Sequence, residues 1–190
     1  MAEFTAKRTE LIQAPVAAVY AYVSDFPRHT EWNHAPTEMT KLTDGSVDVG
    51  SVFRTKEQAS SNQPRILRLI WPLLGKITGS AGYTEAEITA LEPNRRVTWK
   101  ATAPLKNGSL MARSEWEIHL EKRDEGILVT QSVHFEFLGK MGERINPETA
   151  AAQTGEEMGR NLARLKEIVQ ARTATENVSG RTAFPESQGT

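Results

Sequence analysis

The stretch NPETAAAQTGEEMGRNLARLKEIVQAR, residues 146–172, predicts one long helix around which the rest of the chain is organised. Asn146 can cap the free N–H groups of the first turn, and Pro147 suits a first helical position, where no amide donor is needed. Apolar and small side chains then recur at alternating steps of four and three residues, which places them on one face. The members of this face are Ala151, Gly155, Met158, Leu162, Leu165 and Val169.

Composition describes one folded domain with a sizeable core. The chain has 190 residues, of which 38% are hydrophobic and 25% charged, and its formal net charge is −1. Without a basic block, a nucleic-acid partner is not expected, because such surfaces neutralise phosphates. The chain has no cysteine, so disulfides and thiolate metal sites are excluded. No apolar run is long enough for stable membrane insertion, and the first residues lack signal-peptide features, so a cytoplasmic location is expected.

Strand patterns fill most of the chain before the long helix. Residues 110–120 and 127–137 alternate strongly, with apolar side chains on one face and polar side chains on the other. A sheet with one apolar face is typically antiparallel and covered on one side. Weaker patterns predict strands at 5–13, 37–42, 51–57, 84–91 and 96–102, and two short helices within 14–34. We therefore predict an α+β fold in which a curved antiparallel sheet of about six or seven strands wraps around the C-terminal helix.

Two segments fall outside these patterns. Residues 173–190 hold almost nothing apolar, so we expect a domain over 1–172 followed by a disordered tail. Residues 66–74 form the most apolar run in the chain, inside a poorly patterned segment, 58–82. This run could be a further buried strand and turn, a lid over a cavity, or an exposed surface that binds a partner, a membrane surface or a second copy in a homodimer.

Several short motifs occur in a characteristic order. They are Ile12-x-Ala14-Pro15 with Val19, Tyr20, Val23 and Asp25, then Trp32, then Glu92-Pro93-Asn94-Arg95-Arg96-Val97-x-Trp99, Trp116, and Asn161-Leu162-x-Arg164-Leu165-Lys166. In order and spacing the chain resembles the START-like helix-grip superfamily, and within it the bacterial polyketide cyclase/dehydrase and lipid-transport (SRPBCC) proteins. The resemblance implies a cavity between sheet and helix. It does not single out one function, because members include lipid carriers, receptors and cyclases.

Inward aromatic side chains are the first candidates for lining such a cavity. Trp99 and Trp116 are expected on the inner faces of adjacent strands, and Trp116 would form an aromatic wall with Phe135 and Phe137. An inward tryptophan most often fills a core, so that alternative stays open.

Polar residues on the apolar face are the second candidates. Ser114 and Gln131 have this position, and Arg54 shares it if Val52 and Arg54 face inward. Burying such groups unpaired costs about 2–7 kcal/mol. They either bond to backbone or buried water, or they orient the polar end of a mostly apolar ligand.

Two glycines inside the long helix are the third candidates. Gly155 and Gly159 each cost about 1 kcal/mol relative to alanine. They allow either close packing of the helix against the sheet or an open space beside Ala151, Thr154 and Met158.

The sequence lacks a recognisable catalytic or cofactor motif. It has no phosphate-binding glycine loop, nucleophile elbow or zinc-protease pair, so no cofactor is predicted. His119 and His134 alternate with glutamates on outer faces, which fits a solvated sheet better than a metal site. His29 and His34 are expected to be exposed at a helix end.

The sequence thus favours a carrier or sensor that binds a small hydrophobic or lipid-like molecule. The alternative is a cyclase or dehydratase acting on a polyketide-like substrate, with Gln131, Ser114 or Arg54 assisting. The residues expected to line the cavity are Trp99, Ser114, Trp116, Gln131, Phe135, Phe137, Ala151, Gly155 and Met158.

Overall fold

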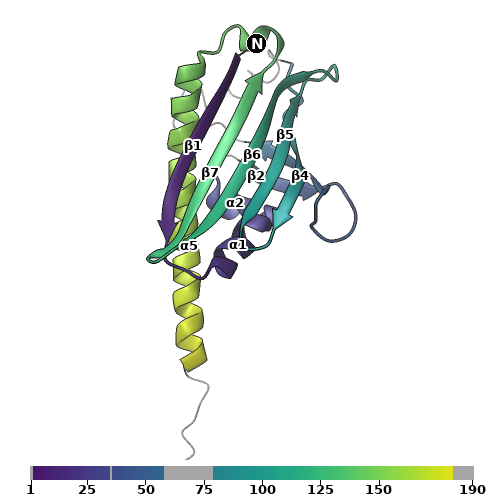
Figure 1. Cartoon of the computed structure of the whole chain (residues 1–190). Coiled ribbons are helices and arrows are strands. Elements are labelled where there is room, and N and C mark those ends of the chain that lie inside the picture. Colours follow the sequence, from purple (N-terminus) through teal and green to yellow (C-terminus); the bar gives the residue numbers. More distant parts are fainter. Residues whose placement is uncertain (1, 35, 58–78, 182–190) are drawn as a thin grey trace, which may run out of the picture.

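The computed structural model describes residues 2–34, 36–57 and 79–181, which form one sheet, one long helix and several short helical segments (Figure 1). The apolar run at 66–74 lies outside the described residues. The elements in chain order are β1 (Ala2–Ile12), α1 (Val16–Ser24), η1 (Phe26–Arg28), α2 (His29–Trp32), β2 (Pro36–Lys41), β3 (Val52–Glu57), β4 (Thr84–Glu92), β5 (Arg96–Pro104), β6 (Leu110–Arg123), β7 (Gly126–Phe137), α4 (Gly139–Gly142) and α5 (Pro147–Arg181).

The sheet has seven antiparallel strands in the order β1-β7-β6-β5-β4-β3-β2. Strands β2 to β7 form a meander, and β1 joins its far edge, with Ala2 opposite Phe137 and Ile12 opposite Ile127. The α1, η1 and α2 segments follow β1 directly. This arrangement confirms the predicted helix-grip fold, including its short helices after the first strand.

The long helix begins where its sequence predicts. The Thr149 backbone N–H donates to Asn146 Oδ1 at 3.0 Å, so Asn146 caps the first turn. The predicted end at Arg172 is wrong, because α5 continues to Arg181. Residues 173–181 are therefore helical rather than part of a disordered tail, and 182–190 lie outside the described residues. Within the described chain, no helix combines the length and apolarity needed to cross a membrane.

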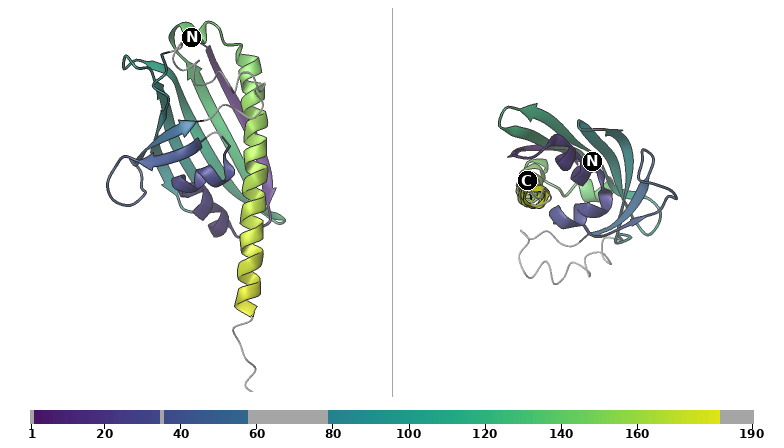
Figure 2. Two further views of the ribbon diagram at one scale, coloured as in Figure 1. Left: turned by 180° about the vertical axis from the view of Figure 1, so that it is seen from behind. Right: turned by 90° about the horizontal axis from the view of Figure 1, so that it is seen from below.

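Helix α5 lies along β1 and also contacts the short helices (Figure 2). On the β1 side, Lys166 Nζ contacts Glu10 Oε1 at 2.6 Å. On the other side, Arg164 Nε donates to the Glu31 carbonyl at 2.6 Å, and Asn161 Nδ2 donates to Asn33 Oδ1 at 3.0 Å. The helix therefore connects the edge of the sheet to α2.

Two hydrophobic clusters lie on the face of the sheet that α5 covers, here called the inner face. The larger one, the closed core, includes Leu162, Leu165 and Val169 of α5 with Ile118 and Val129 of the sheet. The smaller one, the open cluster, has Phe4, Ala6, Val133 and Met158 at its centre, with Trp116, Phe135, Phe137, Ala150 and Ala151 packed around them. Helix α5 thus contributes to both clusters along one stripe.

Candidate functional site

The sheet residues in and beside the open cluster form two adjacent rows, each of which runs across neighbouring strands. Pairing places Ala6, Val133, Trp116 and Trp99 in one row, and Phe4, Phe135, Ser114 and Ala101 in the next. Phe4 and Phe135 stack with ring centroids 5.4 Å apart, and Phe135 and Phe137 are 4.7 Å apart. Trp116, Phe135 and Phe137 remain partly exposed, whereas most apolar side chains of the closed core are fully buried. Trp116, Phe135 and Phe137 thus pack around the same cluster on the inner face.

The two predicted tryptophans form one stacked pair. Trp99 and Trp116 are directly opposite on β5 and β6, with ring centroids 5.8 Å apart and planes within 1°. Trp116 Nε1 donates to Ser114 Oγ at 2.8 Å. Ser114 thus has a partner inside the protein and holds the Trp116 ring in place.

Gln131 lies between the two clusters. It is only 1% exposed, and its amide oxygen Oε1 has no hydrogen-bond partner among the described residues. Along β7 it falls between Val129 of the closed core and Val133 of the open cluster. Burial of an unpaired amide is unfavourable, so this residue requires an explanation beyond packing.

The helix residues predicted to line the site differ in how far they are buried and in which residues they contact. Met158 is buried in the open cluster, and Ala151 is partly exposed beside it. A Cβ built on Gly155 would lie 2.7 Å from Arg8 Nη2, so the guanidinium of Arg8 occupies that position. Close packing accounts for Gly155, and the hypothesis that this glycine leaves an open space is wrong. A Cβ on Gly159 would meet no atom of the described residues within 4 Å.

The conditional placement of Arg54 on the inner face is wrong. Phe53 and Thr55 are buried, which places Arg54 on the outer face. There its Nη2 lies 2.7 Å from Glu85 Oε1, and its guanidinium carbon lies 4.2 Å from the centre of the Tyr83 ring. Arg54 therefore does not assist chemistry on the inner face.

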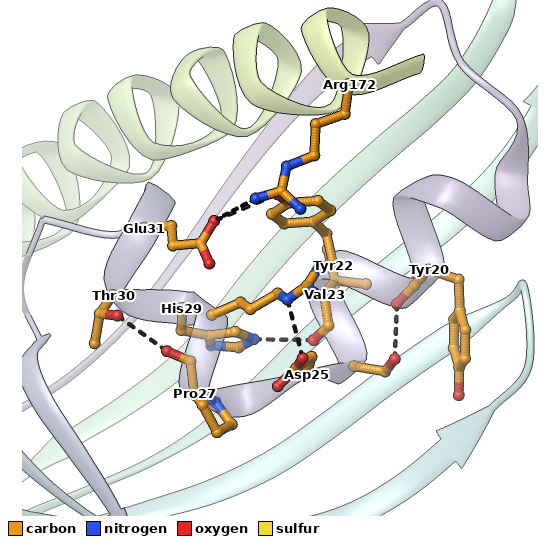
Figure 3. A network of polar contacts seen from close by, with 11 residues as sticks. Tyr20, Tyr22, Val23, Asp25, Pro27, His29, Thr30, Glu31 and Arg172 are labelled. Carbon is orange, nitrogen blue, oxygen red and sulfur yellow. Dashed lines mark hydrogen bonds and ion pairs between the residues drawn. The ribbon is translucent and has the colours of Figure 1, made fainter. Parts of the chain in front are cut away.

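His29 is buried rather than exposed, which contradicts the sequence prediction. It is 3% exposed, stacks on Phe26 at 4.6 Å and contacts Trp32 at 4.8 Å. Its Nε2–H donates to the Val23 carbonyl at 2.9 Å, as Figure 3 shows. Burial lowers the pKa of His29 to about 4, although this hydrogen bond acts in the opposite direction. The missed signal was the three-residue spacing of Phe26, His29 and Trp32, which places them on one side of consecutive helical turns.

The outer face of the sheet carries a shallow, open depression of different character. Its lining alternates between polar residues and residues whose side chains belong to the inner face. The polar residues are Thr5, Lys7, Thr89, Thr98, Lys100, Glu115, Glu117, Ser132 and His134, and the others are Ala6, Trp99, Trp116 and Val133. Many of these groups already bond one another: Lys100 pairs with Glu115 at 3.1 Å, and the hydroxyls of Thr89 and Thr98 are 2.8 Å apart. Among the described residues, no three His, Asp or Glu side chains are grouped as metal ligands. A charged, internally paired surface does not suit an apolar ligand.

Comparison with known proteins agrees with this architecture. Residues 1–170 match the family described as polyketide cyclase / dehydrase and lipid transport. No curated protein matches the sequence.

Several solved structures share the fold. One is an uncharacterized protein from Rhizobium leguminosarum, with 16% identity and a TM-score of 0.58, where the match covers 89% of this chain and 95% of the other. Ara h 8.0201 has 13% identity and a TM-score of 0.59, with 89% and 99% covered. A protein from Chromobacterium violaceum has 16% identity and a TM-score of 0.54, with 87% and 96% covered. The family match shows that the chain belongs to the polyketide cyclase / dehydrase and lipid transport (SRPBCC) family, which typically binds hydrophobic ligands.

Proposed function

We propose that this chain binds a small hydrophobic or lipid-like molecule between the inner face of the sheet and the N-terminal half of α5, as a carrier or sensor. The observation that carries the proposal is the partial exposure of Trp116, Phe135 and Phe137 on the inner face. Leaving apolar surface in water costs about 25 cal/mol per Å². A ligand that covered these rings would recover that free energy.

The lining that we propose follows from the contacts around the open cluster. Trp116, Phe135 and Phe137 form the wall, Trp99 supports Trp116 from behind, and Ala151 and Met158 contribute the helix side. Gln131 lies at the inner end of the site. Ser114 acts through Trp116, and Gly155 is left out because Arg8 fills its position.

A binding role is favoured over catalysis by the chemistry of these side chains. In the two rows from Ala6 to Trp99 and from Phe4 to Ala101, none of the side chains ionises near neutral pH. His29, whose pKa is strongly shifted, packs on Phe26 and Trp32 of the closed core and bonds to backbone. A cyclase or dehydratase would need a group that moves a proton beside the substrate, and the described inner face offers none of this kind next to the aromatic wall.

Fluorescence binding with the neutral apolar probe N-phenyl-1-naphthylamine tests the proposal. The wild-type protein should bind the probe, and native mass spectrometry after gentle purification should detect a co-purified apolar molecule. Phe135→Ala should weaken probe binding by about tenfold, because a buried aromatic contact contributes roughly 1–2 kcal/mol to affinity.

Tyr83→Ala is the matched control. Tyr83 is a partly exposed aromatic residue that contacts Arg54 away from the inner face, so its loss should leave probe binding unchanged. Circular dichroism should confirm that both variants fold. Absence of probe binding by the wild type, or equal binding by Phe135→Ala, would contradict the proposal.

A further inference from the structure

Gln131 has a polar group that the protein itself does not satisfy. Gln131 is 1% exposed, and its Oε1 atom accepts no hydrogen bond from any residue that the structure describes. The neighbours along β7 on the same face are Val129 and Val133, and the residue opposite on β6 is Ile118. All three are hydrocarbon side chains, so the amide lies in an apolar environment at the boundary of the open cluster.

Arg8, which pairs with Gln131 from β1, is directed elsewhere. Its Nη1 donates to the Lys7 carbonyl at 2.9 Å, and its guanidinium lies against Gly155. A leucine or methionine at position 131 would fill the same volume without the cost of an unpaired amide. The presence of glutamine is therefore explained if a group that is not part of the protein completes the hydrogen bond.

The surroundings of Gln131 also limit the charge that a group bonded to its Oε1 atom can carry. Among the described residues, the buried polar side chains are His29, Ser51, Thr55, Ser114, Gln131 and Asn161, and no Lys, Arg, Asp or Glu is among them. Arg160 has buried, unpaired guanidinium nitrogens. It is two positions from both Met158 and Leu162, so it lies on a different side of α5. A carboxylate beside Gln131 would thus lose its hydration, and the cation that pairs with Gln131 across the strands, Arg8, is turned toward Gly155 and the Lys7 carbonyl instead.

We infer that the ligand of the proposed site carries a neutral hydroxyl group that donates to Gln131 Oε1, and that Gln131 selects such molecules over purely apolar or carboxylate-bearing ones. A hydroxyl serves either orientation of the amide, because it both donates and accepts. This inference rests on the proposed binding function and adds the polarity of the ligand to it. The aromatic wall binds the apolar body, and Gln131 binds the polar end.

Three probes with the same flat apolar body test this selectivity: naphthalene, 2-naphthol and 2-naphthoate. Each is titrated near pH 7 against N-phenyl-1-naphthylamine bound to the protein. In the wild type, 2-naphthol should displace the fluorescent probe at about fivefold to tenfold lower concentration than naphthalene, as one additional hydrogen bond predicts. The charged 2-naphthoate should be the weakest competitor.

Gln131→Met is the decisive variant, because methionine has a similar length and no amide. It should lose the preference for 2-naphthol over naphthalene. Without ligand its melting temperature should rise, since an unpaired buried amide has been removed. Ser132→Ala, next to it on the outer face, should keep both the wild-type preference and the wild-type melting temperature.

The outcomes separate this inference from the proposed function. If the wild type binds N-phenyl-1-naphthylamine but does not distinguish naphthalene from 2-naphthol, binding stands and the role of Gln131 is overturned. The same follows if Gln131→Met keeps the preference, or if 2-naphthoate binds best. If the wild type binds no probe, the proposed function fails and the inference fails with it.

Discussion

The parts of α5 before and after residue 160, here called its N-terminal and C-terminal halves, share one apolar stripe but have different surroundings. In the C-terminal half, Leu162, Leu165 and Val169 are at most 1% exposed and belong to the closed core. In the N-terminal half, Ala151 and the rings of Phe135 and Phe137 are partly exposed. A single amphipathic helix can therefore stabilise the fold with one half and leave the other half for a ligand.

The boundary between the halves explains how both properties coexist. Met158 of the open cluster and Leu162 of the closed core are successive positions of the stripe, and Gln131 marks the same boundary on β7. Regions that bind ligands are generally less stable than the core that supports them. The closed core can hold the sheet and helix together while the open cluster adapts to its ligand.

Truncation of one apolar side chain in each half tests this comparison most strongly. Leu162→Ala should lower the free energy of unfolding by about 2–5 kcal/mol, because it leaves a cavity in a fully buried site. Phe137→Ala should cost less, about 1–2 kcal/mol, since part of its ring is already in solvent. Urea denaturation of both variants measures the difference.

Ligand binding should show the opposite order for the same two variants. Phe137→Ala should weaken binding of N-phenyl-1-naphthylamine, whereas Leu162→Ala should bind it nearly normally under conditions where it is folded. Equal losses of stability in the two variants would mean that the halves do not differ as described.

The pH dependence of stability tests whether His29 is buried against the closed core. Burial lowers the pKa of His29 from 6.5 to about 4, so between these values the unfolded chain binds a proton that the folded chain does not. Stability should therefore be constant above about pH 6.5 and fall as the pH decreases, by up to about 3 kcal/mol. Urea denaturation at a series of pH values measures this slope.

His29→Gln is the control for this slope. The variant loses the stacking on Phe26, so it should be less stable than the wild type at neutral pH. It should nevertheless show a flatter profile in the window between about pH 6.5 and pH 4. A wild-type slope that persists in the variant would show that other groups are responsible.

Much of the open cluster could be predicted from the sequence because alternation fixes which side chains share a face. The alternation of β6 and β7 by itself predicts that Trp116, Gln131 and Phe135 share the covered face, whichever strands pair with them. Residues that alternate over a long strand keep their relative orientation whichever strands are neighbours. Helix capping by Asn146 was predictable for a similar reason, since it depends only on adjacent residues.

The sequence predictions that are wrong concern properties that depend on contacts between residues far apart in the chain. The side of β3 that Arg54 occupies depends on a register shift of one residue, which a short strand does not determine. The burial of His29 depends on how α2 sits against Trp99, with ring centroids 5.7 Å apart. The neighbour of Gly155 is Arg8, from the other end of the chain. None of these contacts leaves a periodic signal in the sequence.

The two helix glycines provide the smallest and most specific test. Gly159→Ala should raise the free energy of unfolding by about 1 kcal/mol, because in the described part of the chain the new methyl group meets no atom within 4 Å and only helix propensity changes. Gly155→Ala should give little net change, because its methyl group must displace the guanidinium of Arg8 and disturb the bond to the Lys7 carbonyl.

The contribution of Arg8 can be isolated by repeating Gly155→Ala in an Arg8→Ala background. In that background the methyl group has room, so the substitution should raise the free energy of unfolding by about 1 kcal/mol, which is the full difference in helix propensity between glycine and alanine. Urea denaturation of the four proteins in this cycle gives the coupling between the two positions. If Gly155→Ala were as stabilising as Gly159→Ala with Arg8 present, Arg8 would not pack against Gly155. The space beside that glycine would then be open, and Gly155 would rejoin the lining of the ligand site.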